Sequence, residues 1–378
     1  MSNPLHDLHA AGQSIWLDFI DRTLLQGETL AARIRDEALT GMTSNPTIFE
    51  KALASGTAYD AQLREAAGSR TAWELFELVE TEDVRTACDA FAEIHRRTKG
   101  RDGFVSIEVS PGAAHDADAT VAEAHRLWKT VDRPNVMIKV PGTPEGAIAL
   151  ERLIADGLNV NVTLLFSVEA YARIIEAHLK GLEARAAAGG ALSSVGSVAS
   201  FFVSRVDSAV DAILDAKVSD GSLSAADAAA LKGKAAIANA KRAYTLFGAQ
   251  YSGPRWEKLA ARSAQVQRPL WASTSTKNPE YRDTIYVEQL IGPHTVNTMP
   301  PATIAAFRDH GVTARTVDAD VASSEAALAA LDAAGIALDD VTDRLLAEGL
   351  ASFQKSFDTL VSGIERKTAA LGRTLAAS

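Results

Sequence analysis

The chain has 378 residues, of which 47 % are hydrophobic, a composition typical of a globular protein with a substantial core. Its 48 acidic and 38 basic residues give a net charge of −10, which argues against a general affinity for nucleic acid. The single cysteine, Cys88, excludes an intrachain disulfide and a thiolate zinc cluster, and the lack of an export signal or of a run of about eighteen apolar residues favours a cytoplasmic protein outside the membrane.

The first predicted strand, residues 14–20, is a buried apolar run that contains one acidic residue, Asp18. A helix follows over residues 28–38, where apolar residues recur every four positions. A short strand then runs into a turn within residues 41–46, in which Asn45 is a natural N-cap. Asn45 therefore has two interpretations at this point, a structural cap and a functional amide.

Residues 73–98 predict a long helix with Cys88 on its apolar face, so we expect this thiol in the core. The third strand, residues 104–109, contains one acidic residue, Glu108, near its C-terminal end. A helix with apolar positions between residues 121 and 131 separates it from the fourth strand.

The fourth predicted strand, Val136–Val140, contains a lysine, Lys139, within an apolar run. Burying an ammonium group without a partner costs several kcal/mol, and a lysine commonly avoids this cost by losing its proton. A free lysine with a pKa near 10.4 is neutral in roughly one molecule in a thousand at pH 7, whereas a pKa of about 7–8 makes it an effective nucleophile. The alternative is that Lys139 ends the strand, with its amine in solvent or paired to a carboxylate.

Gly157 closes the helix that follows this strand. The fifth strand, residues 160–166, contains Asn161 and Thr163. The next helix has His178 on its apolar stripe, which favours a packed histidine over a metal ligand.

The sixth strand, residues 197–203, contains Ser200 and Phe202 and is followed by Arg205. An alanine-rich helical stretch, residues 206–264, forms an elaboration before the seventh strand. It is joined too closely to the neighbouring strands to be a separate domain.

The seventh strand is predicted at residues 269–274 and the eighth at residues 284–288. The tail, residues 323–371, has apolar residues at steps of three and four, which suits a long helix packed on the rest of the molecule. Eight strands separated by helices predict an α/β fold, a (β/α)8 barrel, since each parallel crossover requires a helix. We expect residues 1–378 to form this single domain.

Polar residues lie in or just after successive predicted strands, and in a (β/α)8 barrel such positions converge at the C-terminal mouth. These residues are Asp18, Asn45, Glu108, Lys139, Asn161, Thr163, Ser200 and Arg205. They include no histidine, and no Gly-rich dinucleotide motif follows the first strand, so we expect neither a metal nor a cofactor. A lysine with two carboxylates suits Schiff-base chemistry, in which the amine attacks a ketone and the iminium withdraws electrons during C–C cleavage.

Five segments, in order along the chain, resemble those of transaldolases: Met42–Pro46, Val105–Val109, Met137–Val140, Asn161–Ser167 and Ser200–Arg205. Residues 290–300 are similar to the longer bacterial and plant members. The resemblance implies a cofactor-free class I aldolase barrel of the non-oxidative pentose phosphate pathway. Such an enzyme transfers a dihydroxyacetone unit from sedoheptulose 7-phosphate or fructose 6-phosphate to glyceraldehyde 3-phosphate or erythrose 4-phosphate.

The resemblance also implies roles for the residues that would do the chemistry. Lys139 matches the Schiff-base lysine, and Glu108 resembles the acid that works through a bound water. Thr163 would position that water. Asp18 resembles the acid/base that takes the hydroxyl proton when the C–C bond breaks.

Further positions match substrate-binding residues of the family. Asn45 and Asn161 resemble the residues that hold the dihydroxyacetone hydroxyls, and the substrate channel would be lined by Ser200 and Phe202. Arg205 resembles a phosphate-binding arginine, a role that Ser275 would share. Lys277 is found where many members have a second phosphate-binding arginine, and a lysine binds phosphate as a point charge without the planar fork of arginine.

Two other functions remain open from the sequence. An aldolase of the same chemistry would release free dihydroxyacetone from fructose 6-phosphate, and a non-catalytic barrel would only bind sugar phosphates. In each case the partners are sugar phosphates. We expect a monomer or a homodimer, with the tail helix on its own barrel.

Overall fold

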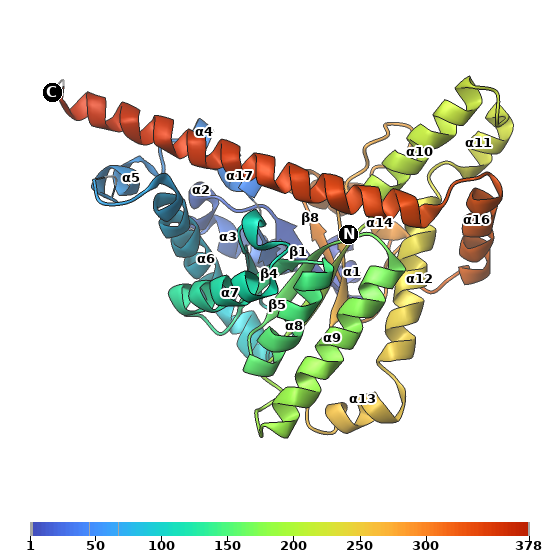
Figure 1. Ribbon diagram of the computed structural model, residues 1–378, viewed down its shortest axis with the longest axis horizontal. Helices are drawn as coiled ribbons and strands as arrows, with labels where there is room; N and C mark the ends of the chain where they lie inside the picture. Colours follow the sequence, from blue (N-terminus) through green and yellow to red (C-terminus); the bar gives the residue numbers. More distant parts are fainter. Residues whose placement is uncertain (1–2, 45, 67, 377–378) are drawn as a thin grey trace.

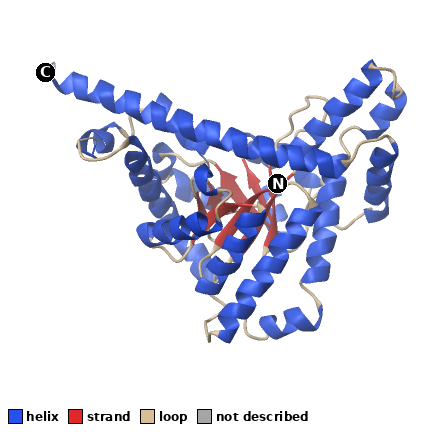
Figure 2. Ribbon diagram, viewed as in Figure 1, coloured by secondary structure: helices blue, strands red, loops and turns tan. Residues whose placement is uncertain are grey.

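The computed structural model describes residues 3–44, 46–66 and 68–376. In these ranges eight parallel strands close into a barrel in the order β1 to β8, and helices surround it (Figures 1 and 2). The predicted (β/α)8 barrel is therefore confirmed. The strands are β1 Gln13–Asp18, β2 Leu39–Thr43, β3 Val105–Glu108, β4 Val136–Pro141, β5 Val160–Leu165, β6 Ser197–Phe202, β7 Arg268–Ala272 and β8 Thr295–Met299.

The helices surround the barrel, and α17 lies across its C-terminal end. They are α1 Pro4–Ala10, α2 Arg22–Leu25, α3 Thr29–Asp36, α4 Pro46–Ser55, α5 Asp60–Ala66, α6 Ala72–Arg97, the 3₁₀ turn η1 Pro111–Ala113, α7 Ala117–Val131, α8 Pro144–Asp156, α9 Val168–Ala187, α10 Ser204–Ser219, α11 Ala225–Leu231, α12 Ala235–Gln250, α13 Gly253–Ala260, α14 Ile285–Glu288, α15 Pro301–His310, α16 Val321–Ala333 and α17 Leu338–Ala376. Helices α10 to α13 form the expected elaboration between β6 and β7.

The prediction for the eighth strand is wrong. Residues Ile285–Glu288 form helix α14, in which the backbone N–H groups of Val287 and Glu288 both donate to the carbonyl oxygen of Thr284 at 3.0 Å. The eighth strand is Thr295–Met299, which pairs with β1 and β7. A short apolar run fits either a strand or a helical turn, and its periodicity cannot separate the two.

Two residues with possible reactivity lie in the core, as the sequence indicated. Cys88 is fully buried, and burial raises the pKa of its thiol. His178 Nδ1 lies 2.9 Å from the hydroxyl of Tyr251, and burial lowers the pKa of the imidazole to about 3, which keeps it neutral. Both residues therefore have structural roles.

Alternate strand residues point into the barrel and form layers. One interior layer is an apolar cluster of Trp16, Phe104, Met137, Val198, Leu270, Ala272 and Val296. Two residues further along β1, β4 and β6, the next inward side chains are polar, namely Asp18, Lys139 and Ser200. The polar groups thus lie at the C-terminal end of the barrel, next to this apolar layer.

A buried carboxylate lies toward the opposite end of the barrel. Asp102 accepts a hydrogen bond from Trp16 Nε1 at 2.9 Å and lies 3.4 Å from Arg268 Nη2. Arg268 Nη1 in turn donates to Ser14 Oγ at 2.7 Å. These contacts join β1 to β7 and hold the indole of Trp16 in the apolar layer.

Helix α17 lies across the C-terminal end of the barrel and runs from α10 toward α4 and α5 (Figure 1). The ring of Phe357 packs 4.9 Å from that of Trp73 on α6, measured between centroids. Further along, Lys367 Nζ donates to the carbonyl of Leu53 at 2.8 Å and lies 2.9 Å from Asp60 Oδ1. The predicted packing of the tail helix on its own barrel is confirmed.

By length and composition, no single helix in the described ranges could cross a membrane. Only α16 together with the Leu338–Leu371 part of α17 meets that test, and the two are bent by 89° relative to each other.

The first prediction concerns Gly41 on β2, where a Cβ would lie 2.5 Å from Trp16 Nε1. The substitution Gly41→Ala would displace the indole and break its hydrogen bond to Asp102. We expect the midpoint of thermal unfolding to fall by a few degrees, because overpacking costs about 1–3 kcal/mol. In the control, Gly248→Ala near the end of α12, the added Cβ meets no atom within 4 Å, so its midpoint should hold or rise. Equal midpoints for the two variants would contradict the close packing at Gly41.

Candidate active site

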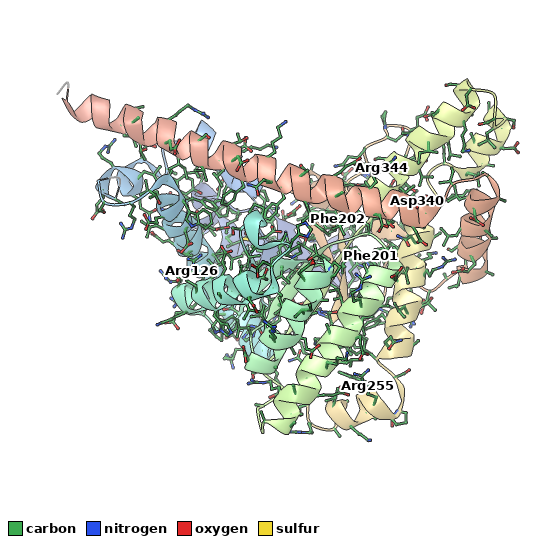
Figure 3. The ribbon with its side chains drawn as sticks, in the orientation of Figure 1. Arg126, Phe201, Phe202, Arg255, Asp340 and Arg344 are labelled. Carbon is green, nitrogen blue, oxygen red and sulfur yellow. The ribbon has the colours of Figure 1, made fainter. Side chains whose placement is uncertain are left out.

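The C-terminal end of the barrel contains a cavity of about 630 Å³. Of the predicted site residues in the described ranges, all except Asn161 line it: Asp18, Glu108, Lys139, Thr163, Ser200, Phe202, Arg205, Ser275 and Lys277. Figure 3 shows Phe202 beneath α17, whose residues Gly349, Ser352 and Phe353 line the same cavity. The remaining predicted residue, Asn45, lies outside the described residues.

Lys139 is buried and paired with Glu108. Its Nζ lies 3.0 Å from Glu108 Oε2 and 3.4 Å from the carbonyl oxygen of Ser44. The two residues are direct partners in the β3–β4 register, and their side chains are 11 % and 6 % exposed. Of the alternatives left open by the sequence, an amine in solvent is wrong, whereas pairing with a carboxylate is observed.

A second carboxylate, Asp18, lines the same cavity and interacts electrostatically with Lys139. Burial raises the pKa of Asp18, an effect opposed by the charge of Lys139 and by a hydrogen bond from Thr43. Burial likewise raises the pKa of Glu108, again opposed by Lys139 and reinforced by the negative charge of Asp18. The cavity therefore holds two carboxyl groups whose proton affinity is raised, as acid and base groups require near neutral pH.

Asn161 lies just under the cavity, on the strand next to Lys139 and in register with it. Its amide Nδ2 donates to Ser106 Oγ at 3.0 Å, and its Oδ1 accepts from Ser200 Oγ at 2.7 Å. These bonds assign the amide orientation and link three strands. Asn161 and Ser200 therefore form one hydrogen-bonded unit beside the lysine.

Thr163 is followed by an irregularity in β5. The register of β5 with β6 shifts between Val162 and Leu165, and Leu164 has a left-handed backbone with φ of 60°. A bulge turns neighbouring side chains to the same side, and both Thr163 and Leu164 line the cavity. A Cβ on Gly349 of α17 would lie 3.1 Å from Leu164 Cδ2, so the helix approaches the barrel closely at this point.

The far end of the cavity is cationic. The guanidinium carbon of Arg205 lies 5.3 Å from the centre of the Phe202 ring, and burial lowers the pKa of Arg205. Burial and the charge of Arg205 together lower the pKa of Lys277, whose Nζ donates to Ser275 Oγ at 2.8 Å. Burial destabilises the charge of both cations, and Arg205 further destabilises that of Lys277, which favours binding of an anion near them.

Among the residues described by the structure, no group of three or more His, Cys, Asp or Glu side chains is placed to hold a metal ion. The groups gathered in the cavity are one amine, two carboxyls, hydroxyls, an amide and two further cations. This set can form an imine, move protons and bind an anion.

Residues 15–364 match the family described as transaldolase/fructose-6-phosphate aldolase. The chain belongs to this family. It is 48 % identical over 366 residues to the transaldolase of Mycolicibacterium smegmatis, covering 96 % of this chain and 97 % of the relative. It is 44 % identical over 373 residues to that of Trichodesmium erythraeum, covering 97 % and 98 %. The full-length similarity confirms the resemblance found in the motifs and supports transaldolase function, that of an enzyme transferring aldehyde or ketone residues.

Three site residues were missed by reasoning from the sequence. Thr43 Oγ1 donates to Asp18 Oδ1 at 3.0 Å and lies 2.7 Å from Thr298 Oγ1, while Ser106 holds the amide of Asn161. Two sequence features could have identified Thr43 and Ser106. Both lie inside the family-like segments, and both occupy strand positions whose side chains point into the barrel. Thr298 also lies in a family-like stretch, residues 290–300, but its inward direction was not predicted because the eighth strand was placed elsewhere.

The second prediction follows from the bond between Thr43 and Asp18. In Thr43→Val the bond is lost, and because it stabilises the carboxylate, the pKa of Asp18 should rise. The acid limb of the pH profile of kcat/KM should then move up by about 0.5–1 pH unit, since such a bond contributes about 1 kcal/mol. The variant Thr43→Ser keeps the hydroxyl and should retain the wild-type profile. An unchanged acid limb in Thr43→Val would show that the bond does not tune the group that limits activity.

Proposed function

We propose that the protein transfers a dihydroxyacetone unit between sugar phosphates through a Schiff base on Lys139. The single observation that supports this most is the buried contact of 3.0 Å between Lys139 Nζ and Glu108 Oε2, inside a cavity whose other end is cationic. The donor would be sedoheptulose 7-phosphate or fructose 6-phosphate, and the acceptor an aldose phosphate of the non-oxidative pentose phosphate pathway.

The first half of the reaction forms the iminium. Lysine must lose its proton before it attacks the ketone at C2, and Glu108 is close enough to accept that proton. The resulting carbinolamine loses its hydroxyl as water after Glu108 returns a proton, through a water held by Thr163. The raised pKa of Glu108 suits both transfers, because a group with a pKa nearer to neutrality both accepts and donates.

Cleavage of the C3–C4 bond follows. Asp18 takes the proton of the C4 hydroxyl, the bond breaks to give an aldehyde, and its electron pair moves into the iminium to form a three-carbon enamine. Asn161 and Ser200, already bonded to each other, would hold the hydroxyls of that fragment, together with Asn45. An acceptor aldehyde then reverses these steps, and hydrolysis of the new iminium frees Lys139.

The cations would bind the phosphate of both donor and acceptor. Arg205 supplies a planar guanidinium, and Ser275 with Lys277 supplies a hydroxyl and a point charge. A phosphate held by these cations would fix which carbon of the substrate lies beside Lys139.

Transfer to an acceptor is favoured over release of free dihydroxyacetone. Helix α17 covers the cavity through Gly349, Ser352 and Phe353, and a covered site limits the access of water to the enamine. Relatives of the same full length are named transaldolase, which agrees with this choice. The oligomeric state, monomer or homodimer, stays a prediction.

The third prediction tests the Schiff base. Borohydride reduction in the presence of fructose 6-phosphate should leave a three-carbon adduct on the wild type, measured by intact mass and located by peptide mapping. Lys139→Ala should form none, whereas Lys277→Met, which changes another lysine in the same cavity, should still form it at saturating substrate. An adduct on Lys139→Ala, or none on the wild type, would refute the assignment.

The fourth prediction tests the role of α17. Phe353→Ala should raise the rate at which fructose 6-phosphate releases dihydroxyacetone without an acceptor by at least severalfold, because more water reaches the enamine. Gln354→Ala alters an exposed neighbour on the same helix and should match the wild type. If release in Phe353→Ala stays at the wild-type rate, the helix does not protect the intermediate.

A further inference from the structure

The loop after β7 contributes Ser275 and Lys277 to the cavity, and two tyrosines further along this segment contact α10. Tyr281 donates from its hydroxyl to Asp211 Oδ2 at 2.5 Å, and Tyr286 donates to Asp207 Oδ2 at 2.9 Å. We refer to Asp207, Asp211, Tyr281 and Tyr286 as the aspartate–tyrosine clasp. Both aspartates lie on α10, the helix that has Arg205 in its first turn.

Each aspartate of the clasp uses its other oxygen to hold the start of α12. Asp207 Oδ1 accepts from the backbone N–H of Ala236 at 2.8 Å, and Asp211 Oδ1 accepts from that of Gly233 at 3.1 Å. The two carboxylates therefore join three segments: α10, the chain leading into α12, and the loop after β7.

Burial of the clasp residues restricts the loop after β7 to one position. Asp207 and Tyr286 are 1 % and 2 % exposed, and burial raises the pKa of Asp207 to about 6 against the effect of its hydrogen bonds. Burial and the aspartate charges raise the pKa of both tyrosines, which keeps their hydroxyls protonated as donors. A buried carboxylate is costly without its donors, so the loop is held in the one position that supplies them.

Tyr281 has little freedom to move. A Cβ on Gly233, whose φ is +69°, would lie 2.8 Å from the Tyr281 ring, so the ring packs directly on that glycine. The backbone N–H of Tyr281 donates to the carbonyl of Asn278, which makes a tight turn after Lys277. A small cavity of about 250 Å³ is lined by Lys277, Tyr281 and Asp211 together, so the clasp adjoins the residue that also lines the main cavity.

We propose that the aspartate–tyrosine clasp positions Lys277 beside Arg205 so that the pair binds a phosphate group. The proposal rests on the proposed function only for the identity of the substrate. The binding of an anion by Lys277 and Arg205 can be tested without it. Arg205 is fixed on α10, whereas Lys277 is in a loop, and the clasp connects this loop to the same helix. It gives the elaboration after Arg205 a purpose, because Gly233 and Ala236 belong to that elaboration and complete the hydrogen bonds of both aspartates.

Removal of one hydroxyl tests the proposal. Tyr281→Phe keeps the ring on Gly233 and loses only the bond to Asp211. We expect its KM for fructose 6-phosphate to rise about tenfold, because Lys277 is then held less firmly beside Arg205, while kcat stays within about twofold. Borohydride trapping with dihydroxyacetone, which has no phosphate, should proceed at the wild-type rate. The control Tyr244→Phe loses a tyrosine hydroxyl bonded to Pro293 O at 3.0 Å and should leave KM unchanged.

A binding measurement separates this proposal from the catalytic one. Inorganic phosphate should raise the thermal midpoint of the wild type and of Tyr244→Phe, and raise it less in Tyr281→Phe and in the reference variant Lys277→Met. If the wild type forms no adduct on Lys139 but shows this pattern, the proposed function fails and the anion site remains. If Tyr281→Phe keeps the wild-type KM and phosphate response, or loses trapping with dihydroxyacetone as well, the clasp does not position Lys277.

Discussion

The burial of an ammonium group beside a carboxylate is the constraint on which the rest of the structure depends. Lys139 and Glu108 are partners on neighbouring strands, so strand pairing and not a loop sets their separation. Taking such a pair out of water is costly unless geometry and hydrogen bonding are good, and removing one partner leaves an unpaired charge. An apolar layer lies on one side of the pair and a long helix on the other. The apolar surroundings that make the pair costly to bury would also protect a reactive intermediate.

The sequence was most informative where polar groups interrupt buried strands. Four polar residues lie at strand positions where an apolar residue would cost less free energy to bury, and the barrel brings them to one cavity: Asp18, Glu108, Lys139 and Thr163. Family-like motifs added the roles, which the geometry alone leaves as proposals. The prediction of the eighth strand was wrong because a short apolar run has no period that separates a strand from a helical turn. Thr298, which lies on the observed strand, was therefore missed as a site residue. The spacing of apolar residues predicted which face of the tail helix packs on the barrel. It did not predict the cavity that the helix covers, since contacts between distant segments leave no local sequence pattern.

The cavity is divided between two parts of the fold. The lysine end is built from strand residues held by regular pairing, whereas the cationic end comes from the first turn of α10 and from the loop after β7. The positions of the two cations must therefore be fixed by contacts other than strand pairing. Those contacts include buried carboxylates with several donors each, and the inserted helices supply part of them. This arrangement accounts for an elaboration that composition alone described only as alanine-rich.

The position of α17 in the chain has a consequence for biosynthesis. The ribosome completes all eight strands, and with them the lysine, both carboxylates and both cations, before it makes the helix that covers them. A nascent chain at that stage would expose the apolar faces of α4 and α6 against which α17 later packs. Segments left exposed in this way invite association with other chains. Docking of the last helix would then end this exposure and complete the covered cavity in the same step.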